Sequence, residues 1–543
     1  MVNLTTRTAV LSGLAALAAT TTASPILTTS NTNTTTNGTA PAQPPVITLS
    51  PSGLELHGTI NTTRSPSVAQ YLGIPYAAPP TGARRFAPPE PFASLVDTTV
   101  VDASRPAKSC WQHVSAAPGI LRTDAPEFMI ADAADNMSED CLSVSVWAPV
   151  NGTRLVGGTE EEGAKGLLPV VVWFYGGGFA TGGTDVPYQL PDRWVERSGE
   201  HLVVAFNYRL NIFGFPNAAG LDEKKQNVGL MDQRFAVEWI RDNIAAFGGD
   251  PEQMVIWGQS AGAVAVDYYN FAYPSDPIVK GLIMDSGTAH LDQLTSWDLG
   301  HTNFTAVAQG LGCGANQTAA AELACMREAP ASKIANFIAE YQDSTATNKK
   351  TLSFSPRADN VVVFGNYTER IKDSDLVSGL PAVIGFNRNE GAFLADYDAV
   401  AGPDAATVAS LGYEYFYCPA TKTSLERDDA GLATHRYYYA GNFSNVSPLW
   451  FDGAYHSSEL PQIFGTAGDF RGESTTFEEE VGQAMQDAWL AFAKDPKKGL
   501  DGVEWPKWKG LGGDVRQFAV GDVVAQTGDA VTFEEECQRR GLL

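Results

Sequence analysis

Short runs of β-branched and aromatic residues alternate along this chain with longer stretches that have helical spacing of apolar residues. The apolar runs predict buried strands at residues 169–174, 202–207, 254–257, 282–284 and 381–386. Residues 230–247 place apolar side chains at 235, 239, 240 and 244, which predicts a helix that ends at Gly248. Continuous apolar strands separated by helices are typical of a large, mostly parallel sheet with helices on both faces, so we predict an α/β fold.

The first 45 residues lack this alternation. Arg7 precedes an apolar stretch at residues 9–19 and then small residues, which is typical of a secretory signal peptide over residues 1–23. Residues 24–45 are Thr, Asn and Pro with little to bury, which predicts a disordered linker. The apolar stretch is too short to span a bilayer, so no stable membrane anchor is expected. Residues 46–543 show no second linker and no repeat, which favours one large domain.

Composition and charge narrow the functional classes. The 543 residues are 44% hydrophobic and carry a formal charge of −25. Such a charge repels phosphate backbones, so we expect no nucleic-acid partner. Ten N-x-S/T sequons beyond the signal peptide and an even six cysteines fit a secreted, extracellular glycoprotein. Seven scattered histidines without an HExxH motif make a metal site improbable.

The six cysteines contain no CxxC pair and allow 15 disulfide connectivities. Their spacing only suggests two local loops, Cys110–Cys141 and Cys313–Cys325, which would leave Cys418 with Cys537 by elimination.

A candidate nucleophile lies in the sequence Gly258-Gln259-Ser260-Ala261-Gly262. The pentapeptide alone is weak evidence because glycine is common in this chain, and an ordinary turn serine is the alternative. Its context is stronger, since a predicted strand runs into it and residues 261–269 continue as a plausible helix. A tight strand-to-helix turn needs glycine on both sides of the serine, and this turn projects the hydroxyl into a site.

A serine nucleophile needs an imidazole to take its proton and a carboxylate to orient that imidazole. Four histidines follow Ser260 in the sequence: His290, His301, His435 and His456. The first two come too soon to leave room for a strand and its acid, and His435 opens the 437–443 run at its amino end. His456 lies in a loop beyond that run, and Glu390 follows the strand 381–386, so we predict them as general base and orienting acid.

The triplet Gly176-Gly177-Gly178 follows the strand 169–174 and can present backbone N–H groups to an oxyanion. A flexible turn is the alternative. The triplet lacks the GxGxxG spacing and no Gly-Lys-Ser/Thr follows it, so neither a dinucleotide nor a P-loop site is indicated. We predict no cofactor.

Together these residues resemble the type-B carboxylesterase family, which includes fungal lipases and cholinesterases, and the likeness extends from about residue 46 to the C-terminus. The matching segments are Tyr71–Pro80 (YLGIPYAAPP), Ser138–Pro149 (SEDCLSVSVWAP), Tyr175–Phe179 (YGGGF), Asn207–Phe215 (NYRLNIFGF), Phe247–Pro251 (FGGDP), Gly385–Gly391 (GFNRNEG) and Gly453–His456 (GAYH).

The resemblance implies an α/β-hydrolase fold and the same triad of Ser260, Glu390 and His456. It also implies an oxyanion hole made by the amides of Gly177, Gly178 and Ala261, and a supporting role for Ser286. In cysteine pairing it implies Cys110–Cys141, Cys313–Cys325 and Cys418–Cys537.

Two departures from the family count against a choline-ester enzyme. Ala131 stands where the choline-binding Trp is expected, and Gln259 replaces the Glu that cholinesterases place before the serine. We therefore predict a secreted carboxylic ester hydrolase that forms an acyl-enzyme and acts on neutral esters.

Two alternatives remain open. One is a lipase activated at an interface, in which apolar residues of the Cys110–Cys141 loop form a flap over a lipid ester. Simple packing of these residues on the core is the favoured interpretation. They are Ile120, Leu121, Phe128, Met129 and Ile130. The other alternative is a non-catalytic binding module on the same fold, which is disfavoured because the serine, acid, base and glycines are all present. The oligomeric state does not follow from the sequence.

Overall fold

The computed structural model describes residues 44–92, 100–115, 117–130, 135–150, 166–314, 317–344 and 351–543. The predicted signal peptide and all of the predicted linker except Pro44 and Pro45 lie outside these residues. In the described part, Pro44–Leu543 forms one compact unit, and it has no helix that is both long enough and apolar enough to cross a membrane.

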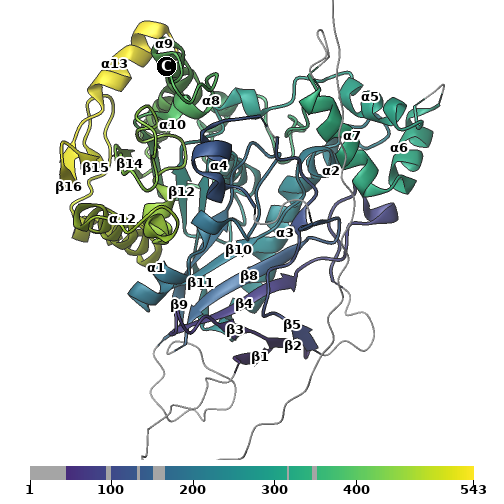
Figure 1. The fold of residues 1–543 in the computed structure, drawn as a ribbon, viewed down its shortest axis with the longest axis horizontal. Coiled ribbons are helices and arrows are strands. Elements are labelled where there is room, and N and C mark those ends of the chain that lie inside the picture. Colours follow the sequence, from purple (N-terminus) through teal and green to yellow (C-terminus); the bar gives the residue numbers. More distant parts are fainter. Residues whose placement is uncertain are drawn as a thin grey trace, which may run out of the picture. The chain divides into compact units, whose positions relative to one another are not determined.

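An eleven-stranded mixed sheet forms the centre of this unit (Figure 1). In spatial order its strands are β16 (Val523–Gly528), β15 (Val515–Val520), β14 (Thr434–Tyr439), β13 (Ala382–Asn387), β12 (Gly281–Asp285), β11 (Gly249–Gln259), β9 (Leu168–Phe174), β10 (Leu202–Phe206), β8 (Ser143–Pro149), β4 (Val68–Pro75) and β3 (Thr59–Ile60).

The seven strands from β15 to β10 run parallel, whereas β16 at one edge and β8, β4 and β3 at the other pair antiparallel. The sheet is therefore mostly parallel, as predicted. A small sheet of β1 (Val46–Thr48), β2 (Glu55–His57) and β5 (Val100–Asp102) and a pair of β6 (Ser109–Cys110) with β7 (Met137–Ser138) complete the strands of the described residues.

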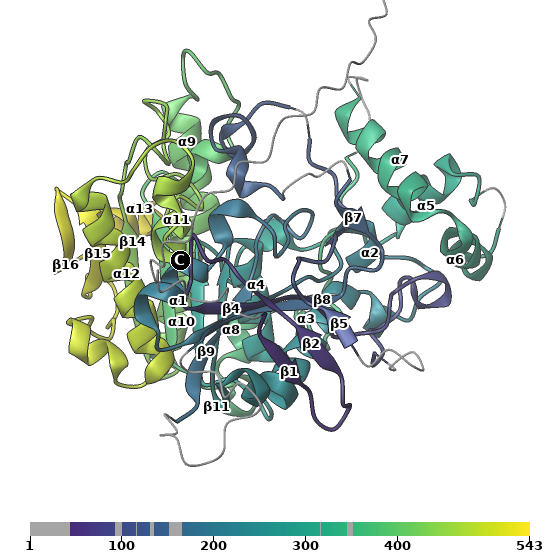
Figure 2. The same ribbon diagram turned by 60° about the horizontal axis from the view of Figure 1, so that its bottom comes forward.

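The α-helices of the described residues are α1 (Asp192–Ser198), α2 (Asn211–Gly214), α3 (Val228–Asn243), α4 (Ala261–Ala272), α5 (Thr302–Gly310), α6 (Ala319–Glu328), α7 (Ala331–Asp343), α8 (Tyr367–Arg370), α9 (Ala405–Gly412), α10 (Cys418–Asp429), α11 (Leu460–Phe464), α12 (Thr476–Lys494) and α13 (Val531–Arg540). Both ribbon views place α5, α6 and α7 side by side (Figures 1 and 2), and their apolar faces form a second buried cluster that includes Phe304, Met326 and Ile334.

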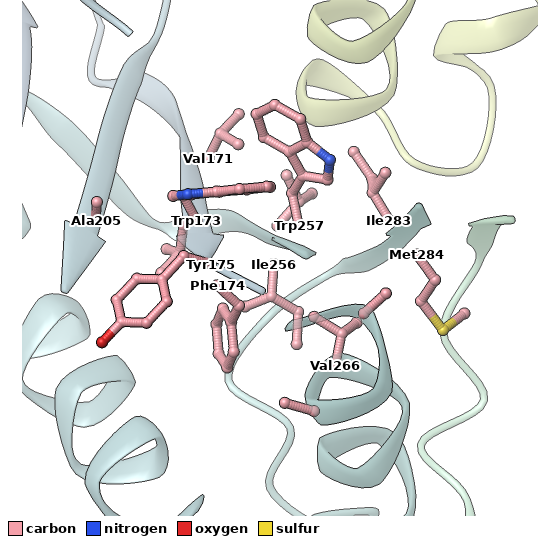
Figure 3. Packing of buried hydrophobic residues seen from close by; sticks show 14 of the residues in the cluster. Val171, Trp173, Phe174, Tyr175, Ala205, Ile256, Trp257, Val266, Ile283 and Met284 are labelled. Atoms are coloured by element: carbon pink, nitrogen blue, oxygen red, sulfur yellow. The ribbon is translucent and has the colours of Figure 1, made fainter. Parts of the chain in front are cut away.

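Helices cover both faces of the sheet. Successive strand residues point to opposite sides, so each strand contributes side chains to the packing on both faces. Figure 3 shows Trp173 and Trp257 on one side of β9 and β11, and Ile256 with Val266 of α4 on the other. The two tryptophan rings lie 4.3 Å apart and both contact Phe464 of α11. The predicted α/β-hydrolase architecture is confirmed.

Three predicted boundaries need correction. The helix predicted at 230–247 is α3 followed by a 3₁₀ turn at Ile244–Phe247, because the chain tightens before Gly248. The strand predicted at 254–257 extends over Gly249–Gln259. The 437–443 run is the strand Thr434–Tyr439, so His435 lies inside the strand near its amino end, and its Nδ1 is 3.0 Å from the carbonyl oxygen of Trp505.

Three disulfides join the six cysteines. Cys110 pairs with Cys141, Cys313 with Cys325 and Cys418 with Cys537, which is the pairing implied by the resemblance. The first closes the loop whose residues 119–129 approach the site described next.

Candidate active site

The candidate nucleophile lies at a sharp turn between a strand and a helix. β11 ends at Gln259 and α4 begins at Ala261, so Ser260 is the single residue between them. Its φ of 56° and ψ of −125° are unusual for a residue with a side chain and store backbone strain. The Ser260 N–H donates to the carbonyl of Asp285 at the end of β12 (2.8 Å), which fixes the turn against the neighbouring strand.

The glycines on either side of Ser260 are needed because other backbone approaches them closely. A Cβ at Gly258 would lie 2.3 Å from the carbonyl oxygen of Gly262, and one at Gly262 would lie 1.9 Å from that of Phe174. Neither space can hold a side chain. The G-x-S-x-G pattern thus records how tightly the first turn of α4 sits on β9 and β11.

Glu390 lies three positions after Asn387, the last residue of β13, and is fully buried. Its Oε1 accepts hydrogen bonds from the Asn387 N–H (2.7 Å) and the Ser286 hydroxyl (2.5 Å). Its Oε2 lies 2.6 Å from Nδ1 of His456. Both carboxylate oxygens are therefore occupied, and the geometry fits an imidazole that donates its Nδ1 proton to Glu390 and leaves Nε2 as an acceptor.

The loops that carry Glu390 and His456 are joined by hydrogen bonds. β13 and β14 are neighbouring parallel strands, so the loops after them emerge at the same edge of the sheet. The Asn389 N–H donates to the carbonyl of Ala454 (2.8 Å), and its side-chain amide donates to the carbonyls of Phe451 (2.9 Å) and Asp452 (2.6 Å). These hydrogen bonds hold Glu390 and His456 together, although the two residues are 66 positions apart in the sequence.

Two aromatic rings pack on the His456 imidazole. The Phe393 ring stacks on it at 4.3 Å with an interplanar angle of 12°, and the Phe416 ring lies 4.6 Å away. His456 is buried. Burial between two rings fixes the imidazole plane and keeps bulk water away from its bond to Glu390.

One pocket is lined by Ser260, Gln259 and His456. Among the hydrogen bonds of the described residues, none joins the Ser260 hydroxyl to the His456 imidazole. The Gln259 amide nitrogen instead lies 3.2 Å from Nε2 of His456. The same nitrogen lies 3.5 Å from Nδ1, and an atom nearly equidistant from both ring nitrogens is off the axis of the Nε2 lone pair, so the amide contacts the ring without taking the acceptor position of Nε2. In catalytic sites without a bound substrate, the hydrogen bond between a serine and its histidine is often long or poorly aligned.

Three backbone N–H groups lie beside Ser260, either next to it in the chain or with it in the pocket. Gly177 and Gly178 follow β9 with φ of 99° and 64°, and both line the pocket with Ser260. Ala261 is the first residue of α4, so its N–H has no partner inside the helix. In the described part of the chain none of the three donates to another backbone carbonyl. Such groups are suited to an anionic oxygen.

The pocket has a volume of about 340 Å³ and a largely apolar lining. One wall comes from the Cys110–Cys141 loop, and others come from the turns after β12, β13 and β14. The apolar lining residues are Val114, Ile120, Leu121, Met129, Leu291, Leu294, Phe393, Leu394, Tyr415 and Phe416. A volume of this size suits a small organic ester with an apolar body.

The residues of the suggested flap divide into two groups. Ile120, Phe128 and Ile130 are buried, whereas Leu121 and Met129 are half-buried, and the pocket is lined by Ile120, Leu121 and Met129. Packing therefore describes the buried side chains of the loop, and three of the five residues belong to the pocket wall. Ala131, where the choline-binding Trp is missing, lies outside the described residues.

Two buried acids near the triad were missed by sequence reasoning. Asp285 accepts a hydrogen bond from the Trp257 indole (2.5 Å), and burial raises its pKa to about 8. Glu459 accepts from the Asn387 amide, and burial raises its pKa well above the usual range. In both cases burial favours the neutral form of the carboxyl group, which limits the negative charge placed near Glu390. Their only sequence signal is position, next to Ser286 and three residues after His456.

Comparison with known proteins gives consistent similarities. The sequence model of the "Carboxylesterase family" matches residues 43–410. "Secreted lipase 5" of Gibberella zeae is 40% identical over 500 residues, covering 88% of this chain and 91% of that protein. "Chlorogenic acid esterase" of Aspergillus niger is 39% identical over 498 residues, covering 89% and 92%. "Para-nitrobenzyl esterase" of Bacillus subtilis is 29% identical, covering 83% and 91%.

Proposed function

The chain belongs to the carboxylesterase family and is a carboxylic ester hydrolase, and on this premise we propose that it cleaves esters through Ser260, His456 and Glu390. The observation that carries the proposal is the buried 2.6 Å contact between Glu390 and an imidazole that shares a pocket with a strained serine.

In the first step the Ser260 oxygen attacks the ester carbonyl carbon, and its proton passes to Nε2 of His456. Glu390 accepts from Nδ1 throughout and stabilises the imidazolium that forms. The hydrogen bonds from Asn387 and Ser286 hold the carboxylate in place for this task.

The carbonyl oxygen becomes an oxyanion, and the N–H groups of Gly177, Gly178 and Ala261 stabilise it. When the C–O bond to the alcohol breaks, His456 gives its proton to the leaving oxygen, and an acyl-enzyme on Ser260 remains. Water then attacks the acyl carbon, His456 takes a proton from that water, and the acid is released as Ser260 regains a proton.

The substrates are small-molecule or lipid esters whose apolar part fills the 340 Å³ pocket. Neutral esters are the broad expectation from the chain as a whole, since it has a charge of −25 and Ala131 stands where the family's choline-binding Trp is expected. An interface-activated lipase is the second candidate, and Leu121 and Met129 at the pocket wall favour it. We also propose that the protein is secreted, in line with its predicted signal peptide and the names of its relatives.

The test uses an active-site-directed organophosphonate together with the Ser260→Ala variant. Mass spectrometry of the labelled wild type should find the phosphonate on Ser260, and Ser260→Ala should lose about 10⁶-fold in kcat while remaining folded. Labelling at another residue, or a folded protein that stays unlabelled, would overturn the proposal and favour a binding module. p-Nitrophenyl esters from acetate to palmitate separate an esterase from a lipase, because lipase activity should rise above the solubility limit of the ester.

A further inference from the structure

The charge of the pocket lining differs from that of the whole chain. The protein has 62 Asp and Glu residues against 37 Lys and Arg. The described lining of the pocket nevertheless contains no Asp or Glu, and it does contain Arg122. A ligand in the pocket therefore meets a local cation inside a protein whose overall field repels anions.

The Arg122 guanidinium is held by backbone carbonyls rather than neutralised by a carboxylate. Its Nε donates to the carbonyl of Ala117 (2.6 Å), and Nη2 donates more weakly to that of Pro118 (3.4 Å). Among the residues that the structure describes, no acid forms an ion pair with it. A guanidinium has five N–H donors, so donors remain for a ligand, and the positive charge remains as well.

Space for the guanidinium is provided by Gly119 in the same loop. A Cβ at Gly119 would lie 2.8 Å from Nη2 of Arg122, so a side chain there would push the guanidinium away. One carboxylate does approach this rim, namely Asp343. A carboxylate oxygen of Asp343 is 3.0 Å from Nε2 of His113 and accepts a hydrogen bond from the Ser115 hydroxyl (3.1 Å). His113 and Ser115 line the pocket, whereas Asp343 does not.

We propose that Arg122 selects esters that carry a carboxylate in addition to the ester group, with the apolar body of the substrate in the pocket and the carboxylate on the guanidinium at the rim. The inference rests on the proposed ester hydrolysis. For this pocket it replaces the broad expectation of neutral esters, which came from the net charge of the whole chain, with a class of anionic esters. A guanidinium and a carboxylate pair through two parallel N–H···O contacts, which gives orientation as well as attraction.

The carboxylate can reside in either product of the reaction, the acid or the alcohol, so the test uses two matched ester pairs. The first pair is 4-carboxyphenyl butyrate and 4-carbamoylphenyl butyrate, with the charge on the leaving alcohol. The second is 4-nitrophenyl 4-carboxybenzoate and 4-nitrophenyl 4-carbamoylbenzoate, with the charge on the acyl group. Within each pair the shape is matched and the charge differs, so the ratio of the two kcat/KM values isolates the charge.

In the wild type we expect the anionic member of one pair to be preferred. In Arg122→Gln this ratio should fall about twofold to fivefold, as for an exposed charge pair, and the ratio cancels any effect of the substitution that is common to both members of a pair. Arg122→Lys should keep part of the preference because it keeps the charge. Raising the salt concentration from about 0.05 to 0.5 M should reduce the ratio in the wild type and have little effect in Arg122→Gln.

Arg84→Gln is the matched control, since Arg84 is an exposed arginine paired with Glu90 outside the pocket, and it should leave all ratios unchanged. Ratios that are the same in the wild type and Arg122→Gln for both pairs would overturn the assignment of Arg122 while leaving ester hydrolysis intact. Failure of the wild type to cleave even the neutral esters would instead overturn the proposed function, and this inference with it.

Discussion

The residues that hold His456 and the pocket wall formed by the Cys110–Cys141 loop are built in different ways. Around His456 the polar groups are buried and joined by hydrogen bonds, and both oxygens of Glu390 are engaged. In the loop, Leu121 and Met129 present apolar surface and Arg122 is exposed. The contrast suggests that the step common to all esters depends on a fixed hydrogen-bond network, whereas the choice among esters depends on side chains that no such network constrains.

This contrast can be tested by changing one region at a time. A change in the hydrogen-bond network should lower kcat for every ester by a similar factor. A change in the loop should alter the ratio between esters and leave the reacting groups intact.

The largest effect is expected for Glu390→Gln. An amide cannot hold the Nδ1–H tautomer of His456 as a carboxylate does, so kcat should fall by about 10³–10⁴-fold. The measurement is kcat for p-nitrophenyl acetate and for a longer ester, and both should fall alike. Glu369→Gln, an exposed residue paired with Lys372, is the control and should have no effect. A loss of less than tenfold would show that Glu390 does not orient the base.

The next effect concerns the disulfide that closes the pocket loop. Replacing Cys110 and Cys141 together with Ser removes a link across 31 residues and should lower the free energy of unfolding by about 3–4 kcal/mol. KM should also rise, because the loop supplies one pocket wall. Urea denaturation and steady-state kinetics measure the two quantities. The double variant of Cys313 and Cys325, whose disulfide pins the α5–α7 cluster, should lose stability and keep its KM; an equal rise in KM there would contradict the comparison.

A pH effect is expected from Asp285. In the folded protein the carboxyl group of Asp285 keeps its proton up to about pH 8, whereas in the unfolded chain it releases this proton near pH 4. The folded state therefore binds more protons than the unfolded state between these pH values. The free energy of unfolding of the wild type, relative to Asp285→Asn, should therefore decrease from pH 5 to pH 8 by at most about 1.4 kcal/mol per pH unit. Denaturation curves at several pH values measure the difference. A difference that is constant or grows with pH would mean that Asp285 is charged in the folded protein.

The smallest effect is expected for Leu121→Ala in the pocket wall. Loss of part of the apolar contact should lower kcat/KM for a long-chain ester about fivefold relative to acetate, which corresponds to about 1 kcal/mol. The ratio of kcat/KM for p-nitrophenyl octanoate to that for the acetate is the readout. An equal loss on both esters would place Leu121 with the network residues instead.

The sequence predicted the two regions to different depths. Apolar runs located the strands, and the position of Glu390 and His456 after strands brought these residues to one edge of the sheet, because chain order and strand direction follow from local pattern. The contact of the Gln259 amide with His456 could not be predicted, since it depends on the side-chain rotamers of residues 197 positions apart.

Buried charge was equally hard to read from the sequence. Asp285 and Glu459 look like any acidic residues until the fold encloses them, and an isolated acidic residue is normally expected at the surface. The ends of α3 and β14 were also misplaced by a few residues, because tertiary contacts decide where a helix tightens or a strand stops. Which residues of the Cys110–Cys141 loop would face the pocket depended on short irregular turns with no period to follow.

The link between Cys418 and Cys537 also bears on how the chain is made. The two cysteines are 119 positions apart in the sequence, and His456 lies between them. A ribosome must therefore release residue 537 before the bridge can close around His456, so this part of the molecule matures only after the enclosed stretch has been translated. A variant truncated before residue 537 would leave Cys418 as an unpaired thiol, open to mispairing during oxidative folding.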